Sequence, residues 1–218
     1  MGSRTILAVA CAAALLTAPG VARGATFIVG APGDDGSGTG ACATATDGCT
    51  LRTAVLRANS AEGADTIALP AGSFALSKAG SGEDGSATGD LDVVESLTIA
   101  GAGSAATTVD GGALDRILDV LDPGAELVLS GLTLGNGNLA GGVAGIRSLG
   151  PALRLSDVVL SGFTGASVVD VGSPGAVTVA LTDSRVTGNL TSLKLVDVHP
   201  NRPATLAPTR RAGQGNTI

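Results

Sequence analysis

The chain has 218 residues and a formal net charge of −6 at pH 7, with 34 glycines and only 1% aromatic residues. An acidic chain with so few aromatic rings is a poor candidate for binding nucleic acid, so we expect no such partner. Its length suits one domain with a sizeable core.

Residues 1–24 have the pattern of a cleavable signal peptide. Arg4 gives the positive start, Ile6 to Leu16 the apolar stretch, and Ala22-Arg23-Gly24 a small-x-small cleavage site. We expect a cut after Gly24, which leaves 194 residues, and a location outside the cell or on its surface. The later apolar runs are short and interrupted, so we expect no membrane span after cleavage.

Residues 25–65 are predicted to form an N-terminal cap. Thr26 to Val29 reads as an opening strand and is followed by a Gly/Asp-rich loop. Cys42 and Cys49 are the two cysteines that remain after cleavage, and two cysteines in an exported protein usually form a disulfide. The alternative, a metal site, lacks further cysteine or nearby histidine ligands.

Thr50 to Asn59 is the one convincing helical pattern. Its apolar residues fall at i, i+3, i+4 and i+7 and form one face: Leu51, Ala54, Val55 and Ala58. Thr50 can serve as N-cap, and Asn59 can end the helix in a left-handed conformation. Such a helix can plug the open end of a repeat fold, which is a structural role.

Residues 66–198 are predicted to form stacked coils, because a 26-residue period runs through three segments. Leu129, Leu155 and Leu181 superimpose, as do Ser130, Ser156 and Thr182, and Leu134, Leu160 and Val186. A fixed period with strand alternation predicts an all-β solenoid, the parallel β-helix. Other predicted strands are 66–69, 74–76, 97–99, 117–121, 168–171 and 193–198.

Residues 199–218 contain three Pro and three Arg and show no strand alternation. We therefore expect an irregular, disordered tail. A solenoid without a cap exposes a core edge, so a truncated fragment of a longer surface protein is a second interpretation.

The segment Cys49-Thr50-Leu51-Arg52-Thr53-Ala54 resembles the string C-S-L-R-E-A, after which a family of secreted bacterial proteins is named. The likeness extends over 65–72 and 97–103 and implies a right-handed parallel β-helix of the pectin-lyase type. The family has Ser and Glu where this chain has Thr50 and Thr53. The reciprocal capping box is therefore incomplete, and Thr53→Glu is expected to strengthen the helix start.

Asp157 and Asp183 occupy equivalent positions in successive repeats, and Arg185 follows two residues later. Stacked carboxylates roughly 5 Å apart could bind a cation or act as acid and nucleophile. The similarity to pectate-lyase-like enzymes implies acids that hold calcium and an arginine base. The simpler alternative, which we favour, is that Asp suits strand corners because it bonds local backbone.

Four acids in Gly-rich loops are candidates for calcium: Glu83, Asp84, Asp90 and Asp92. No known calcium-loop spacing is present, so solvated loop acids are the favoured interpretation, and no other cofactor is expected.

The expected function is a secreted, non-enzymatic adhesin-like or structural module that binds extracellular polysaccharide or a surface protein. The alternative is a polysaccharide lyase, hydrolase or glycan-binding protein of the same fold. The chain has no Trp or Tyr to stack on sugar rings, which counts against that alternative.

Overall fold

The computed structural model describes residues 23–36, 40–189, 194–198 and 204–209. The predicted signal peptide therefore lies almost wholly outside the described residues. The elements in chain order are β1 (Thr26–Ile28), α1 (Leu51–Ala58), β2 (Asp65–Ala68), β3 (Gly72–Ala75), β4 (Leu91–Val93), β5 (Leu97–Ala100), β6 (Thr107–Asp110), β7 (Leu118–Val120), β8 (Glu126–Gly135), β9 (Asn138–Ser148), β10 (Ala152–Ser161), β11 (Thr164–Val171), β12 (Val177–Thr182), β13 (Arg185–Thr187), β14 (Lys194–Val198) and β15 (Ala204–Thr209).

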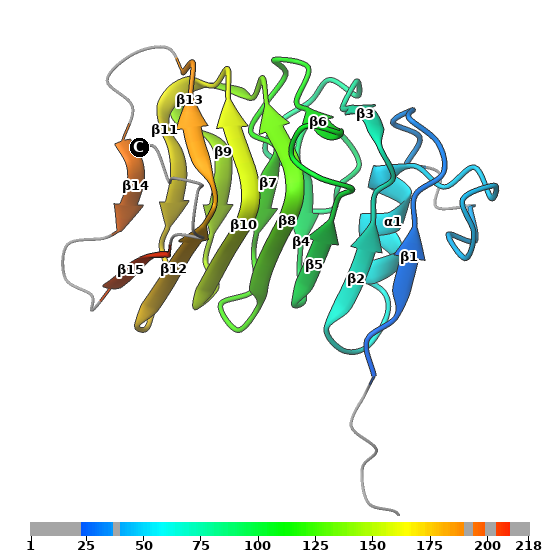
Figure 1. Ribbon diagram of the computed structural model, residues 1–218, viewed down its shortest axis with the longest axis horizontal. Helices are drawn as coiled ribbons and strands as arrows, with labels where there is room; N and C mark the ends of the chain where they lie inside the picture. The colour runs from blue at the N-terminus through cyan, green and yellow to red at the C-terminus, as the bar shows by residue number, and fades with distance from the viewer. Residues whose placement is uncertain (1–22, 37–39, 190–193, 199–203, 210–218) are drawn as a thin grey trace, which may run out of the picture.

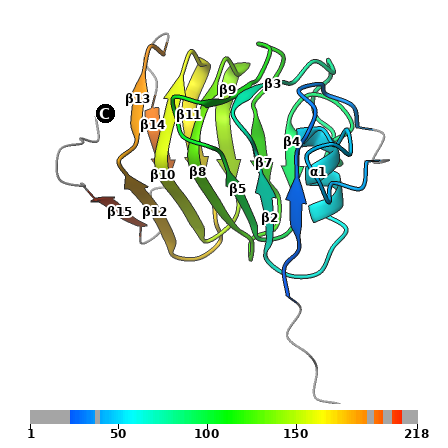
Figure 2. The same ribbon diagram turned by 45° about the vertical axis from the view of Figure 1, so that its right-hand side comes forward.

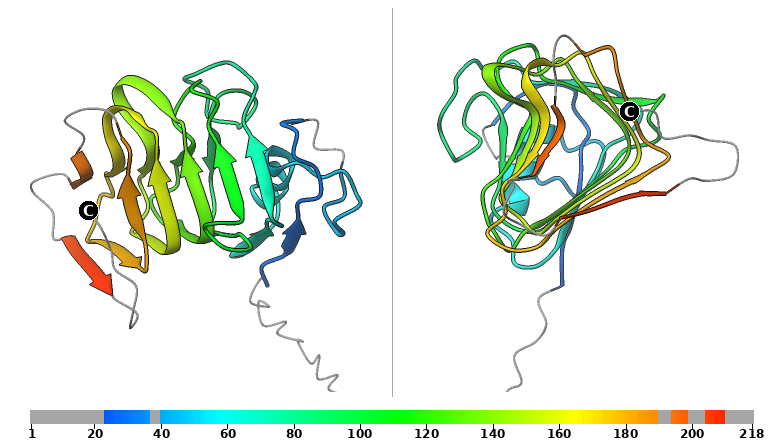
Figure 3. Two further views of the ribbon diagram at one scale, coloured as in Figure 1. Left: turned by 45° about the horizontal axis from the view of Figure 1, so that its top comes forward. Right: turned by 90° about the vertical axis from the view of Figure 1, so that its left-hand side faces the viewer.

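These strands form two parallel sheets that are the walls of a solenoid (Figure 1). One sheet has the order β1-β2-β5-β8-β10-β12-β15, and β3, β6 and β13 pair beside this path. The other has the order β4-β7-β9-β11-β14. Successive coils lie over one another when viewed along the long axis (right panel of Figure 3). The predicted parallel β-helix is confirmed.

The register reproduces the 26-residue period of the sequence. Leu129 pairs with Leu155, and Leu155 pairs with Leu181. Ser130, Ser156 and Thr182 stack in the same way, as the repeat predicts. A one-residue slip would turn every core side chain outward, so the alternation fixes this register.

The inward side chains of the coils form one continuous apolar core that runs from Val29 to Leu181. Leu127, Leu129, Leu153 and Leu155 are at most 2% exposed. Each fully buried leucine contributes about 2 kcal/mol through the area it removes from water. The helix shares this core, because Leu51 lines the same internal space of about 10 Å³ as Leu129 and Leu132.

One corner of the coil requires a left-handed backbone in three successive repeats. Gly131, Asp157 and Asp183 occupy it with φ of 61°, 53° and 49°. A Cβ on Gly131 would lie 2.8 Å from the carbonyl oxygen of Gly101, so the neighbouring coil also leaves no room there. Asp is among the few other residues that adopt this conformation readily, which explains its place in the repeat.

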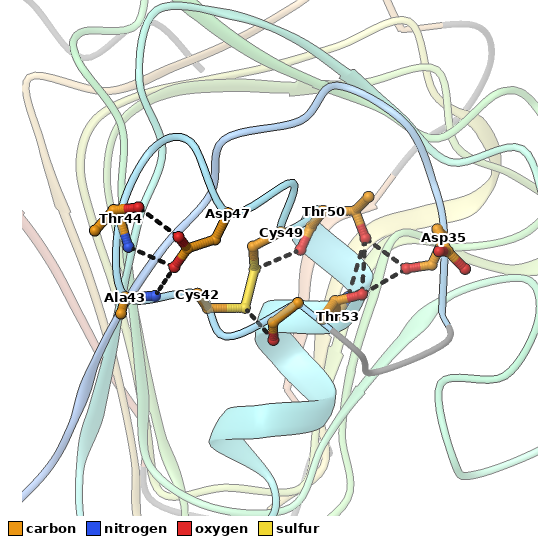
Figure 4. The surroundings of a disulfide bond; sticks show 9 residues. Asp35, Cys42, Ala43, Thr44, Asp47, Cys49, Thr50 and Thr53 are labelled. Carbon is orange, nitrogen blue, oxygen red and sulfur yellow. Dashed lines mark hydrogen bonds between the residues drawn. A yellow bond between two sulfur atoms is a disulfide. The ribbon is translucent and has the colours of Figure 1, made fainter.

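The cap closes the first coil with α1, beside β1 and β4 (Figure 2). The Cys42–Cys49 disulfide is present, as predicted (Figure 4). Asp47 accepts hydrogen bonds from the backbone N–H groups of Ala43 (2.8 Å) and Thr44 (2.9 Å) and so fixes the turn inside this loop.

The start of α1 agrees with the sequence, because the Thr50 hydroxyl accepts from the N–H of Thr53 at 3.2 Å. Thr53 does not lack a partner, however, since its hydroxyl donates to the carbonyl of Asp35 at 2.7 Å. Thr53 is 2% exposed, so a glutamate there would be buried against that carbonyl. The expectation that Thr53→Glu strengthens the helix therefore reverses.

The prediction of a left-handed end at Asn59 is wrong, because its φ of −61° and ψ of −15° are right-handed. Its side-chain amide instead serves as a strand partner. The Asn59 amide donates to the carbonyl of Asp92 at 2.7 Å and accepts from the N–H of Val94 at 3.2 Å. The end of the helix is thereby fastened to β4.

The expectation of an irregular tail is wrong at β15, which pairs with β12 from Val177↔Ala204 to Thr182↔Thr209. The two strands share Thr, Ala and Thr at paired positions, so the repeat continues here with a spacing of 27 residues. Residues 199–203 and 210–218 lie outside the described residues. No helix in the described part of the chain is long and apolar enough to cross a lipid bilayer.

Candidate functional site

An identical tripeptide, Leu-Asp-Val, forms both β4 and β7. The two strands pair in register, so Asp92 lies beside Asp119. The leucines and valines point into the core, and strand alternation turns the central aspartates to the outer face. Two carboxylates are therefore stacked on one wall of the solenoid.

These outward carboxylates are nevertheless buried, because the loop of residues 80–90 folds over them. Asp92 is 0% exposed and Asp119 is 2% exposed. Ser86 of this loop donates its N–H to a carboxylate oxygen of Asp92 at 2.6 Å, and its hydroxyl accepts from the Asp92 N–H at 2.6 Å. The loop thus completes the backbone bonding of β4 and removes its aspartate from water.

Asp90, at the end of the same loop, joins the two stacked aspartates. One carboxylate oxygen from each of Asp90, Asp92 and Asp119 lies within 4.8 Å of the other two. We call these three residues the acidic cluster. Asp115 lies close by and is 1% exposed, with one carboxylate oxygen that makes no hydrogen bond.

Two arginines neutralise part of this negative charge. Arg147 of β9 holds both oxygens of Asp119, with Nε–Oδ1 at 2.7 Å and Nη2–Oδ2 at 2.6 Å. Arg116 contacts Asp90 at 2.8 Å and Asp119 at 3.3 Å. The Arg116–Asp90 contact is an ion pair without hydrogen-bond alignment at Nε. Both guanidinium groups are partly exposed, so they cover the outer side of the cluster.

Burial and crowding perturb the titration of the cluster. Burial, followed by the charges of Asp92 and Asp115, raises the pKa of Asp90 to about 7, although Arg116 opposes this shift. Burial also raises the pKa of Asp92 to about 6, against the hydrogen bond from Ser86. The hydrogen bond with Asp119 raises the pKa of Arg147. The cluster therefore holds more acid than its two arginines neutralise.

Arg52 of α1 fixes the covering loop from the inside. Its guanidinium binds both oxygens of Asp34, at 2.6 and 3.1 Å. It also donates to three loop carbonyls at 2.8 to 3.0 Å, those of Ser86, Gly89 and Asp90. Arg52 is 0% exposed. Burial alone would raise the pKa of Asp34, but the bonds from Arg52 and from two backbone N–H groups hold it below its usual value.

The structure separates the predicted calcium ligands. Asp90 and Asp92 meet in the acidic cluster, whereas Glu83 accepts hydrogen bonds from the N–H groups of Gly85 and Thr88 within its own loop. Asp84 is exposed. The four acids do not form one ligand set, and the third member of the cluster is Asp119 instead.

Asp157 serves the turn of an earlier coil. Its carboxylate accepts from the Ser104 hydroxyl at 2.6 Å and from the Ser104 N–H at 3.1 Å. It reaches that turn past Gly131, which has no side chain in between. Asp183 is half-buried at the next corner, and Arg185 is exposed in β13. These contacts follow the structural alternative that the sequence left open.

Sequence reasoning missed five residues of this region: Arg52, Asp115, Arg116, Asp119 and Arg147. The repeated Leu-Asp-Val at 91–93 and 118–120 is a signal that could have found Asp119. No comparable signal marks Arg116 and Arg147, because they reach the cluster through the packing of different coils.

The acidic cluster has two chemical options. Carboxylate oxygens within reach of one another can hold a calcium ion, which takes six to eight oxygen ligands. A carboxyl that titrates near neutral pH can act as a general acid or base. Either role requires the covering loop or the two arginines to move, because they occupy the approaches to the three carboxylates.

A shallow surface cleft of about 450 Å³ lies elsewhere between turns, and Glu95 and Asp122 are its acidic side chains. Its lining consists of Gly63, Ala64, Val94, Glu95, Ser96, Asp122, Gly124 and Ala125. It contains neither a basic nor an aromatic side chain, so it lacks the usual groups for gripping a sugar or a phosphate.

A scan of protein-family models matches no family to the chain, and searches of the curated proteins and of the solved structures find no similar protein. The architecture itself defines the class, which is that of the parallel β-helix proteins.

Proposed function

We propose that this chain is an exported bacterial β-helix module, similar to the C-S-L-R-E-A proteins, that acts without catalysis. In this proposal it is an adhesin-like or structural unit that presents the wall of its solenoid to extracellular polysaccharide or to a surface protein. The signal-peptide pattern of residues 1–24 and the Cys42–Cys49 disulfide support an oxidising, extracytoplasmic location.

The resemblance gains support from the work that its motif residues do. Cys49 forms the disulfide, Thr50 caps α1, Leu51 enters the core, and Arg52 ties the helix to the covering loop. Each residue of the segment therefore serves the cap, as the family's N-terminal position implies.

The observation that carries the non-catalytic role is the burial of the acidic cluster under ordered contacts. Its three aspartates are at most 3% exposed, and two of them pair with Arg116 and Arg147. A substrate cannot reach these carboxylates without displacing the loop that Arg52 and Ser86 hold.

Polysaccharide cleavage is the second candidate, and the raised pKa values of Asp90 and Asp92 favour it. Perturbed carboxyl groups gather at active sites because acid–base catalysis needs them. Structural ion-pair networks perturb pKa values as well, and here the arginine contacts provide that explanation.

A binding and cleavage screen separates the two candidates. The exported protein is incubated with uronate-rich and with neutral polysaccharides, in calcium and in chelator, and both retention and new chain ends are measured. We expect retention of a polysaccharide or of a surface protein without cleavage. Cleavage that is lost in Asp119→Asn but kept in the control Glu62→Gln would replace the proposal with an enzymatic one. Asp157→Ala and Asp183→Ala test the corner residues in the same assay.

A further inference from the structure

Ala25 is held on both sides at the start of β1. Its backbone N–H donates to the carboxylate Oδ1 of Asp65 at 2.6 Å, and its carbonyl accepts from the N–H of Thr66 at 2.8 Å. Asp65 opens β2, the strand on which β1 pairs. The first residue after the predicted cleavage site therefore sits directly on a carboxylate.

That carboxylate is buried and incompletely satisfied. Asp65 is 1% exposed, and its Oδ2 atom is buried without a hydrogen-bond partner. The ion pairs found among the described residues do not include Asp65. A buried carboxylate without a compensating partner is costly, so this position calls for a further donor or a positive charge.

We propose that cleavage after Gly24 supplies this missing partner, because the new α-ammonium group of Ala25 forms an ion pair with Asp65. Hydrolysis adds one water across the Gly24–Ala25 peptide bond. Gly24 leaves with a carboxylate on the leader, and the amine of Ala25 takes up a proton. With an ordinary pKa near 8, that amine is charged at neutral pH and offers three donors in place of one.

Maturation then fastens the first strand of the solenoid. In the uncut chain one amide N–H meets one oxygen of Asp65, whereas the cut chain brings a charge that can serve both oxygens. Opposite charges within hydrogen-bond distance in a poorly hydrated site attract strongly. The inference rests on the proposed export, since cleavage of the leader is what creates the amine.

Gly24 fits both states of the chain. A Cβ at this position would overlap the carbonyl of Ala64, so the uncut backbone can pass here only as glycine. The cleavage pattern also requires a small residue at the same place. The uncut leader can therefore leave the folded first coil without displacing Ala25 from Asp65.

The first test is a double-mutant cycle on the chain that begins at Ala25. The amine is either free or acetylated, which removes its charge and keeps an N–H, and residue 65 is either Asp or Asn. With Asp65, acetylation should lower the Tm by roughly 4 °C or more. In Asp65→Asn the same acetylation should change the Tm by no more than roughly 1 °C. Glu62→Gln, which removes an exposed acid nearby, should keep the full effect. Equal Tm losses with Asp and with Asn at residue 65 would overturn the inference.

A second measurement does not depend on stability. The α-amine is acylated at neutral pH, and its rate is compared with that of Lys78 in the same sample by mass spectrometry. We expect the amine to react several-fold more slowly with Asp65 than in Asp65→Asn. Equal relative rates would contradict the ion pair even if Asp65→Asn folds poorly.

N-terminal sequencing of the exported protein keeps the two proposals apart. A product that begins at Ala25 but shows no coupling to Asp65 overturns this inference and leaves the proposed export standing. A chain that stays uncut inside the cell overturns the proposed export itself. A mature end at another residue overturns this inference alone.

Discussion

The coils built on β8, β10 and β12 repeat every 26 residues and stack leucine on leucine, whereas the earlier coils differ in length and are joined by specific side chains. Asp65 pairs with Leu97 and Leu97 with Leu127, spacings of 32 and 30 residues. In the earlier coils Arg52, Asn59 and Ser86 make bonds that the later repeats have no need of. Regular repeats rely on their core and ladders, while irregular coils depend on individual polar contacts.

The largest expected effect of a single substitution is at Arg52. Arg52→Met leaves Asp34 buried without its counter-ion and deprives three loop carbonyls of their donor. Removing one partner of a buried ion pair costs about 3–5 kcal/mol. Urea unfolding should show a loss of this size. Arg154→Met, which breaks a half-exposed 3.8 Å pair with Glu126 in the regular coils, should cost less than about 1 kcal/mol. Similar losses in the two variants would remove the contrast between the regions.

In the regular coils the sensitive position is the core. Leu155→Ala opens a cavity between Leu129 and Leu181 and should cost about 3 kcal/mol. Ser156→Ala, on the outer face of the next position, should change the free energy of unfolding by less than about 0.5 kcal/mol. A Leu155→Ala loss below about 1 kcal/mol would mean that these coils are not held by their core.

Thr53→Glu tests the polar contacts of the cap. A glutamate here would be buried and would face the carbonyl of Asp35 that Thr53 now bonds. We expect a loss of about 2 kcal/mol in chemical unfolding, the usual cost of an unsatisfied buried polar group. Thr53→Ser, which keeps the hydroxyl, should retain most of the stability. A more stable Thr53→Glu protein would restore the expectation from the capping box.

The smallest expected effect is the pH dependence of the acidic cluster. The pKa values of about 7 for Asp90 and about 6 for Asp92 lie above their unfolded values near 4, so the folded state binds more protons within this window. The free energy of unfolding should therefore fall as pH rises from about 4 to 7, by of order 1 kcal/mol. Urea titrations at pH 5 and pH 8 measure it. Asp90→Asn should flatten this slope and Glu62→Gln should not, and a slope of opposite sign would contradict the raised values.

The fold was predictable where one residue type recurs at one spacing. The period through Leu129, Leu155 and Leu181 contains the strand register, because each coil must place its apolar residues where the neighbouring coil does. The strand β15 was missed because Pro208 and the arginines around it hide a match to β12. The match lies in Thr205, Ala207 and Thr209, which are paired with Thr178, Ala180 and Thr182.

The candidate site was only partly predictable. Asp90 and Asp92 were named for calcium because acids in glycine-rich loops suggest oxygen ligands. Their partner Asp119 lies one coil away, and Arg147 lies a further coil beyond it. These spacings depend on loop lengths in the irregular coils, which carry no period to read.

The sequence by itself determined the solenoid, the disulfide and the start of the helix, because alternation, cysteine count and capping chemistry act over short distances or at a fixed period. The tertiary structure alone decided that Asn59 pairs with β4, that Arg52 is buried against a loop, and that three aspartates meet beneath that loop. These contacts join residues about 30 or more positions apart, and only the stacking of unequal coils brings such residues together.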